Sequence, residues 1–175
     1  MTALDFREAG QGDAPALHRL IESAYRGDSA RRGWSHEADL LDGQRTDVEE
    51  LSGIIADPKQ VLLLAHDGDR LVGCVRLVDE GEGVAYLGML SIDPARQASG
   101  LGRRLMAEAE TVARDRFGAD RMRMTVIKAR SELIAWYARR GYALTGAEEP
   151  FPMDDERFGL PKRRDLVFVV MEKPL

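Results

Sequence analysis

The sequence is poor in the residues that build disulfides and metal sites. It contains one cysteine, Cys74, and three histidines among 175 residues. A single cysteine excludes a disulfide within the chain and a zinc site built on cysteines. His18 and His66 have no neighbour at the spacing of metal ligands. We therefore expect no metal site, and we expect Cys74, which lies inside a predicted strand, to belong to the core.

Long apolar segments and a surplus of positive charge are missing as well. Runs such as Val61–Ala65 are far shorter than the roughly 20 residues that a membrane helix needs, and no charged-then-apolar leader opens the sequence. The 25 Lys and Arg residues are outnumbered by 30 Asp and Glu residues, which gives a net charge of −5. This balance disfavours nucleic acid as a partner. We expect a cytoplasmic protein with no membrane partner.

What is present is the composition of an ordinary globular domain. Hydrophobic residues make up 44% of the chain and charged residues 31%. A chain of this length can bury roughly 70% of its extended surface on folding. We therefore expect a single domain over residues 1–175.

Periodicity and turn residues predict eleven secondary-structure elements. In chain order they are a strand near Leu4–Ala9, a helix capped by Asp13, a helix from Thr46 or Asp47 to Asp57, strands Val61–Ala65, Leu71–Val78 and Val84–Asp93, a helix Ser99–Phe117, a strand Met122–Ile127, a helix Ser131–Arg140, and strands Tyr142–Thr145 and Leu166–Val170. Hairpins combined with only two crossover helices predict an α/β (α+β) fold with a mixed sheet rather than an all-parallel one.

Two local details of this prediction concern a turn and a helix face. Asp67-Gly68 is a strong two-residue turn signal between two strands. In the second helix, Val48, Leu51, Ile54 and Ile55 recur at helical spacing, and we expect them to face the core.

The most informative segment joins a strand to the longest helix through a loop that contains Gly100 and Gly102. A helix start directs unpaired backbone N–H groups toward one point, and glycine lets an anion approach the backbone closely. Arg96, Arg103 and Arg104 concentrate positive charge there. A pyrophosphate is the ligand that this pattern favours, although two glycines can also serve only to open a helix.

The familiar nucleotide-binding patterns do not fit this loop. Leu105 stands where a dinucleotide fingerprint has its third glycine, and no Gly-Lys-Ser/Thr sequence follows. A Rossmann site and a P-loop are therefore both excluded.

Two motifs resemble those of the GNAT acetyltransferases. Gln97-x-x-Gly100-x-Gly102, which follows Leu90-x-Ile92-x-Pro94, is similar to that family's acyl-CoA pyrophosphate motif. Tyr137-x-x-x-Gly141-Tyr142 is similar to its Tyr-x-x-x-Gly-Phe/Tyr segment. The resemblance implies a mostly antiparallel sheet of six or seven strands flanked by about four helices. It also implies acetyl-CoA as a co-substrate and an amine as the acceptor.

The resemblance implies a set of residues that hold the cofactor. The backbone of Leu90, Ser91 and Ile92 would pair with pantetheine, between the strands Val84–Asp93 and Met122–Ile127. The pyrophosphate would be held by backbone N–H groups of the loop, with help from Arg103. The residues that give these N–H groups would be Gln97, Ala98, Ser99, Gly100, Leu101 and Gly102. Arg130 stands where relatives often carry an asparagine that contacts pantetheine. It would either reach a phosphate or close over the acceptor.

The chemistry implied is attack of a primary amine on the thioester, with a tyrosine that protonates the departing thiolate. Tyr137 matches the family's tyrosine, and its alternative role is to pack on the core beside Leu133. The general base is open, because Leu87–Leu90 offer no carboxylate. Glu37, His36 or a chain of water molecules could accept the proton of the amine.

The acceptor site is expected in the two long loops Arg26–Arg45 and Glu148–Arg164. Trp34 and Phe151 would form its apolar walls, and Glu37 or Asp154 would attract a cationic amine. Trp34 could instead anchor its loop, and the run Asp154–Glu156 could simply be solvated. A small-molecule amine fits best. A protein lysine or N-terminus, or a non-catalytic acyl-CoA sensor, remains an alternative, and the protein is expected to be a monomer or a homodimer.

Overall fold

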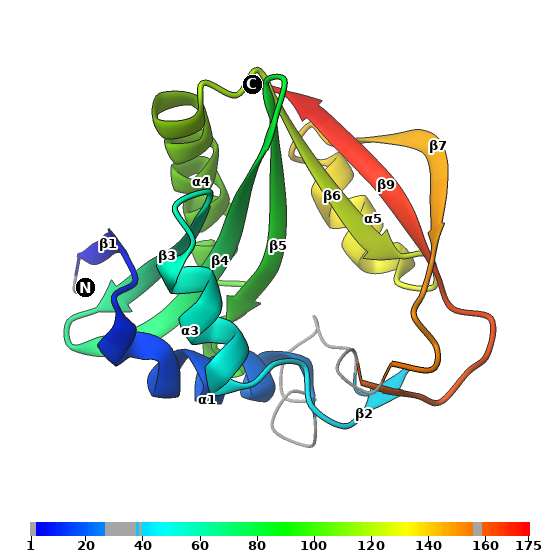
Figure 1. The fold of residues 1–175 in the computed structure, drawn as a ribbon, viewed down its shortest axis with the longest axis horizontal. Helices are drawn as coiled ribbons and strands as arrows, with labels where there is room; N and C mark the ends of the chain where they lie inside the picture. Colours follow the sequence, from blue (N-terminus) through cyan, green and yellow to red (C-terminus); the bar gives the residue numbers. More distant parts are fainter. Residues whose placement is uncertain (1–2, 27–37, 39, 156–158) are drawn as a thin grey trace.

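The computed structural model describes residues 3–26, 38, 40–155 and 159–175. All eleven predicted elements are present, and Figure 1 shows their arrangement. The strands are β1 Leu4–Glu8, β3 Gln60–Asp67, β4 Arg70–Gly81, β5 Val84–Ile92, β6 Arg121–Ile127, β7 Ala143–Pro150 and β9 Val167–Pro174. The helices are α1 Ala14–Tyr25, α3 Val48–Ala56, α4 Leu101–Phe117 and α5 Ser131–Ala138. The short strands β2 Leu41–Asp42 and β8 Leu160–Pro161 form a separate pair.

The seven longer strands form one sheet in the order β1-β3-β4-β5-β6-β9-β7. Each neighbouring pair is antiparallel except β5 and β6, which are parallel. This is the mixed, mostly antiparallel sheet that the sequence predicted. The crossover from β5 to β6 runs through α4, as a parallel connection requires.

Helices cover both faces of the sheet, and the strand β3 shows this most directly. Leu62 and Leu64 pack in a cluster with α1 and α3, whereas Leu63 and Ala65 pack with α4. Successive side chains of a strand point to opposite faces, so a strand covered on both sides is apolar at every position. This double burial explains the continuous apolar run of β3.

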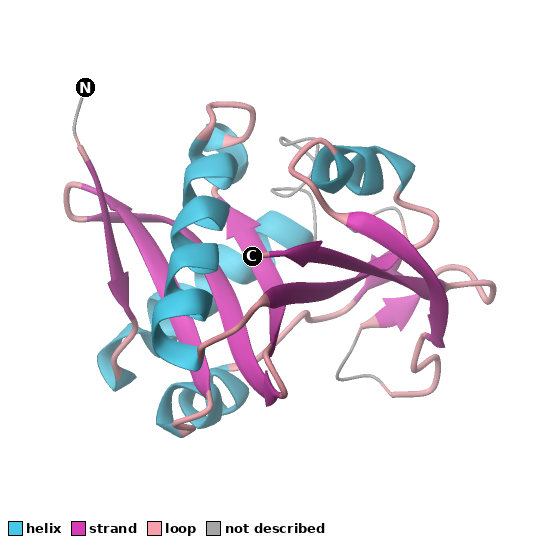
Figure 2. Cartoon of the chain, turned by 90° about the horizontal axis from the view of Figure 1, so that it is seen from above, coloured by secondary structure: helices cyan, strands magenta, loops and turns pink. Residues whose placement is uncertain are grey.

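The sheet splits between β5 and β6. The two strands pair only from Val84 to Tyr86, and a hydrogen bond of 2.8 Å between the Tyr86 and Thr125 hydroxyls closes the junction. Beyond it, the register between β4 and β5 shifts, and Met89 adopts a positive φ of 51°. Such a bulge bends a strand and increases its twist. The two halves of the sheet consequently run in different directions, as Figures 1 and 2 show.

Several local predictions were wrong. The Asp13 side chain does not cap α1; it accepts hydrogen bonds from the Gly10 N–H and from Arg7, both at 2.8 Å. Val48 is 41% exposed, because α3 begins at this residue. Of the four residues predicted to face the core, only Leu51 and Ile54 are fully buried.

Other differences concern where elements begin and end. The turn between β3 and β4 is Gly68-Asp69, one position later than predicted, because Asp67 still pairs with Arg70. The strand β7 continues to Pro150, because pairing with β9 resumes after an irregularity between Leu144 and Glu148. No helix in the part of the chain that the structure describes is long and apolar enough to cross a membrane.

Leu105 tests the contact between α4 and the sheet, because its side chain is fully buried. We expect Leu105→Ala to lower the free energy of unfolding by about 2–5 kcal/mol, through lost apolar contacts and the cavity that remains. Leu144→Ala is the matched control; this leucine on β7 is 56% exposed and should change the value by about 0.5 kcal/mol or less. Urea denaturation measures both, and equal effects would contradict this packing.

Candidate active site

A groove of about 340 Å³ opens at the N-terminus of α4. The backbone before the helix turns sharply, with positive φ angles at Ala98 and Gly100. The first N–H groups of a helix have no partner within it, and they lie at the positive end of its dipole. A Cβ added at Gly100 would meet no atom within 4 Å. The backbone is thus open to a ligand at the point where it presents donors.

The opposite wall of this groove is α5. A Cβ at Gly102 would lie 3.3 Å from the Trp136 ring, so glycine at this position lets α4 and α5 approach closely. The Arg140 guanidinium stacks 3.5 Å from the centre of the same ring. Burial lowers the pKa of Arg140, and the charges of Arg139 and Arg103 lower it further. Arg103 and Arg140 both line the groove, which suits an anionic ligand.

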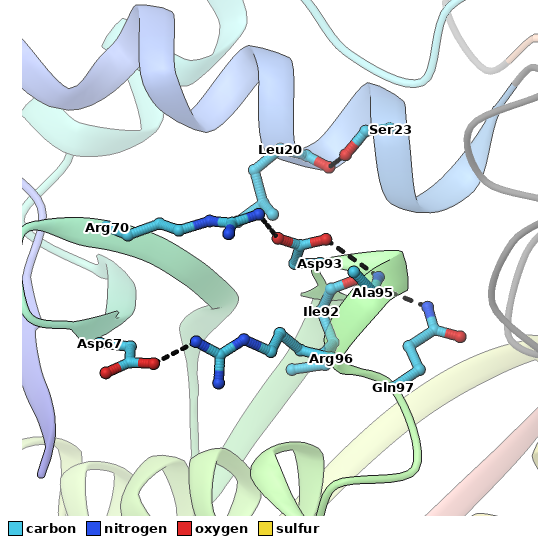
Figure 3. A network of polar contacts seen from close by, with 9 residues as sticks. All are labelled: Leu20, Ser23, Asp67, Arg70, Ile92, Asp93, Ala95, Arg96 and Gln97. Carbon is cyan, nitrogen blue, oxygen red and sulfur yellow. Dashed lines mark hydrogen bonds and ion pairs between the residues drawn. The ribbon is translucent and has the colours of Figure 1, made fainter. Parts of the chain in front are cut away.

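The loop that carries the donors is fixed by ion pairs, shown in Figure 3. Arg70 contacts the Asp93 carboxylate at 2.5 Å, and the same carboxylate accepts from the Ala95 N–H at 3.0 Å. Arg96 pairs with Asp67. The expected concentration of three arginines is therefore only partly right, because Arg96 holds the loop in place while Arg103 lines the groove.

The structure brings most of the predicted cofactor residues together around the groove. Those that line it are Leu90, Ile92, Gln97, Ala98, Gly100, Gly102 and Arg103. Ser91, Ser99 and Leu101 do not line it; Ser91 and Leu101 are buried, and the Ser99 hydroxyl donates to the Arg96 carbonyl at 2.5 Å. Arg130 does not line this groove; it lines a second cavity.

The second cavity, of about 220 Å³, occupies the space where β5 and β6 diverge. Its walls include Gly88 and Met89 of β5 and Val126 and Ile127 of β6. Four residues line both this cavity and the groove, namely Tyr25, Leu90, Leu133 and Tyr137. The two spaces therefore meet at these side chains.

Tyr137 lies at this meeting point and is 6% exposed. Its ring is 5.2 Å from that of Trp136 and 6.0 Å from that of Tyr142, both edge to face. Tyr25 lies on the other side, where its hydroxyl donates to the Leu90 carbonyl at 2.6 Å. Tyr137 thus packs against neighbouring aromatic rings and at the same time lines both spaces.

Of the predicted acceptor residues that the structure describes, Phe151 lines the second cavity and Asp154 does not. Phe151 lines the second cavity and packs on Phe168 at 5.2 Å. Asp154 does not line it; its side chain is 97% exposed. Trp34, His36 and Glu37, and Glu156 of the acidic run, lie outside the described residues.

Sequence reasoning missed the charged residues of the second cavity. They are Arg26, Arg45, Glu50 and Arg76. Arg76 could have been identified from the sequence, because it is the one charged residue in the otherwise apolar segment Leu71–Val78. The others come from segments with no distinctive pattern.

Of the histidines and the cysteine that the structure describes, namely His18, His66 and Cys74, none lines either space. In residues 3–26, 38, 40–155 and 159–175, no group of three or more His, Cys, Asp or Glu side chains is placed to hold a metal ion. Cys74 is fully buried, as predicted, and burial raises the pKa of its thiol to about 12. It is therefore a core residue without a reactive thiolate.

The sequence model of the family described as the acetyltransferase (GNAT) family matches residues 15–142. This span is most of the chain and contains α4, β6 and the tyrosine of α5. No curated protein sequence matches.

Solved structures of acetyltransferases share the fold. The putative acetyltransferase yncA from Salmonella typhimurium, with its cofactor acetyl-CoA, is 17% identical over 99% of this chain and 95% of that chain, with a TM-score of 0.72. A spermidine N-acetyltransferase chimera from Vibrio cholerae and hSSAT is 16% identical over 98% and 95%, with a TM-score of 0.70. The ribosomal-protein-S18-alanine N-acetyltransferase from Escherichia coli is 14% identical over 98% and 94%, also with a TM-score of 0.70.

Gly100→Leu tests whether the groove holds a coenzyme A pyrophosphate, because the new side chain would enter the open space in front of the helix. Gly146→Leu is the matched control; Gly146 also has a positive φ and no atom within 4 Å of an added Cβ, but it lies on β7. A ligand at about 100 times its Kd adds about 2.7 kcal/mol of stability. We expect acetyl-CoA and coenzyme A, but not NAD, to raise the melting temperature of the wild type and of Gly146→Leu. Gly100→Leu should lose most of that shift, and a full shift in this variant would contradict the assignment.

Proposed function

Because the chain belongs to the acetyltransferase (GNAT) family, we propose that it transfers the acetyl group of acetyl-CoA to the primary amine of a small molecule, directly and within a ternary complex. The observation that carries this proposal is the shared wall of the two spaces. A donor in the groove and an acceptor in the second cavity would meet at Tyr137 and Leu90. A panel of amines, assayed by release of the coenzyme A thiol, tests it.

The residues of the groove fit the donor. The backbone donors of Gly100 to Arg103 would bind the pyrophosphate, supported by the Arg103 charge and the helix dipole. The edge of β5 beyond Tyr86 is not paired with β6, so its backbone is available to pantetheine in the manner of an added strand. When bound, acetyl-CoA supplies an acyl group activated as a thioester.

Tyr137 is the residue we assign as general acid. A phenol has an ordinary pKa near 10, so it holds its proton at neutral pH and can donate it to a departing thiolate. Its position at the junction of the two spaces supports this role. The Leu90 carbonyl beside it already accepts from Tyr25, which fixes this part of the β5 backbone.

The amine must lose a proton before it attacks, since an ordinary alkylamine is protonated at neutral pH. Among the described residues that line the second cavity, Glu50 is the one carboxylate. The Thr46 hydroxyl donates to it at 2.6 Å, which orients it. We assign Glu50 as the group that receives this proton, in place of a base on β5, which has none.

Two other functions share this fold. An alanine of ribosomal protein S18 is named as the substrate of one similar structure, and spermidine is named for another. The small size of the second cavity, about 220 Å³, favours a small molecule over a polypeptide segment. A non-catalytic acyl-CoA sensor would have no need of Tyr137.

Tyr137→Phe removes the proposed acid while it keeps the ring. We expect kcat to fall by about 10²–10⁴-fold, the usual contribution of a positioned acid or base, with acetyl-CoA affinity unchanged. Tyr142→Phe is the control, because this hydroxyl donates to Glu110 at 3.1 Å and lines neither space. Steady-state kinetics and a binding titration separate the two variants. Unchanged turnover in Tyr137→Phe would remove it as the acid.

Glu50→Gln removes the proposed proton acceptor at nearly constant shape. We expect kcat to fall by about tenfold or more, while acetyl-CoA still binds. Glu49→Gln on the same turn of α3 should leave kcat unaltered, since Glu49 does not line the cavity. If both variants retain full turnover, another group receives the proton.

A further inference from the structure

The described residues that line the second cavity carry more positive than negative charge, unlike the protein as a whole. Among the described residues that line it, four are arginines and one is a glutamate. The chain as a whole carries a net charge of −5. A positive cavity within an acidic protein is therefore a local feature that the overall composition does not explain.

The four arginines converge from separate parts of the chain. Arg26 follows α1 and is 5% exposed, Arg45 precedes α3, Arg76 lies on β4, and Arg130 precedes α5. They are not a solvated run of neighbours in sequence. Only the tertiary fold brings them to one space, so their charges act together there.

Two of these arginines have only uncharged partners. Arg76 Nε donates to the Gln60 side-chain oxygen at 2.7 Å, and the Arg45 guanidinium lies 5.3 Å from the centre of the Tyr25 ring. In the described part of the chain, no carboxylate lies within ion-pair distance of either guanidinium. Burial lowers the pKa of Arg76 and the charge of Arg45 acts in the same direction, whereas Tyr86, Glu50 and Asp57 act to raise it.

A half-buried positive charge with no carboxylate in direct contact is costly, and a bound anion lowers that cost. Guanidinium groups bind carboxylate and phosphoryl oxygens in pairs of parallel hydrogen bonds, which also orients the ligand. Glu50 lines the same cavity and supplies the opposite charge for an ammonium group. The cavity therefore offers complementary charges for a molecule that carries both an amine and an anion.

We propose that the acceptor is a small amine that also bears an anionic group, a carboxylate or a phosphoryl group, and that Arg45 and Arg76 bind this group. The inference rests on the proposed function and narrows its substrate class. It disfavours polycationic amines, which the charges of Arg45 and Arg76 would repel.

Matched acceptors test the proposal with the wild-type enzyme. The panel holds an amino acid, its amide, its decarboxylated amine and its aminophosphonate, with release of the coenzyme A thiol as the readout. We expect kcat/KM to be at least about tenfold higher for the acids than for the amide and the amine, as one charge-assisted contact would give. The ratio between carboxylate and phosphonate identifies the preferred anion.

The other outcomes each overturn a specific statement. Equal or better use of the amide would indicate a peptide N-terminus and overturn the anionic acceptor. Equal or better use of the decarboxylated amine would overturn it in favour of a basic amine. In both cases the acetyltransferase activity stands. Release of no thiol with any amine would overturn the proposed function itself, and this inference with it.

Arginine variants test the assignment of the anion site. Arg45→Gln and Arg76→Gln should each lower kcat/KM for the acidic acceptor by about tenfold or more, chiefly through KM, and should change that for the decarboxylated amine little. The KM for acetyl-CoA should stay constant. Arg123→Gln is the control, since this β6 arginine pairs with Glu172 and does not line the cavity.

Arg45→Gln keeps the proposal testable if Arg76→Gln does not fold, because the backbone N–H of residue 45, not its side chain, binds Glu22. A variant that retains its preference for the acids shows that its arginine does not bind the anion. Retention by both variants would overturn the assignment.

Discussion

The parallel pairing of β5 with β6 stops after Tyr86, and both candidate binding spaces depend on that interruption. Three residue pairs hold the strands together before β5 bends at Met89. A strand edge without a neighbour has unpaired backbone groups, which a sheet normally pairs, covers or exposes to water. Here α1 and α5 stand over the opening from either side, with Tyr25 and Tyr137 at its centre. The unpaired backbone groups at the edge of β5 thus offer hydrogen bonds that a bound ligand can make in place of a neighbouring strand.

Charge is distributed unevenly around this opening. The groove at the start of α4 has backbone donors and arginines, and the part of the second cavity that the structure describes has four more arginines and one glutamate. The ion pairs of Arg70 with Asp93 and of Arg96 with Asp67 have a structural role, because they fix the loop in front of α4. Partly buried charges interact more strongly than exposed ones because water screens them less. A modest number of arginines can therefore determine which ligands enter, even in a protein whose net charge is negative.

Most of the elements were predictable because their signals are local. The helix that begins after Gly100 and the strand over Val61–Ala65 were predicted correctly from neighbouring residues. The errors also have local causes. Asp13 looked like a cap, but Arg7 and the Gly10 N–H compete for its carboxylate. The end of β7 looked like a loop, because Glu148–Pro150 are polar or proline, yet β9 supplies the backbone partner that extends the strand.

The sequence by itself determined the family and the position of the Gln97–Gly102 loop before α4. The Gln97–Gly102 motif and the Tyr137 motif are each contiguous, so the geometry of each follows from one strand-to-helix junction or one helix. Only the tertiary structure decided which residues line the second cavity. Arg45, Glu50 and Arg76 lie on three segments that no spacing rule relates. Their meeting depends on how α1 and α3 pack on the sheet and on where β5 bends. A site assembled across elements in this way has no signature along the chain.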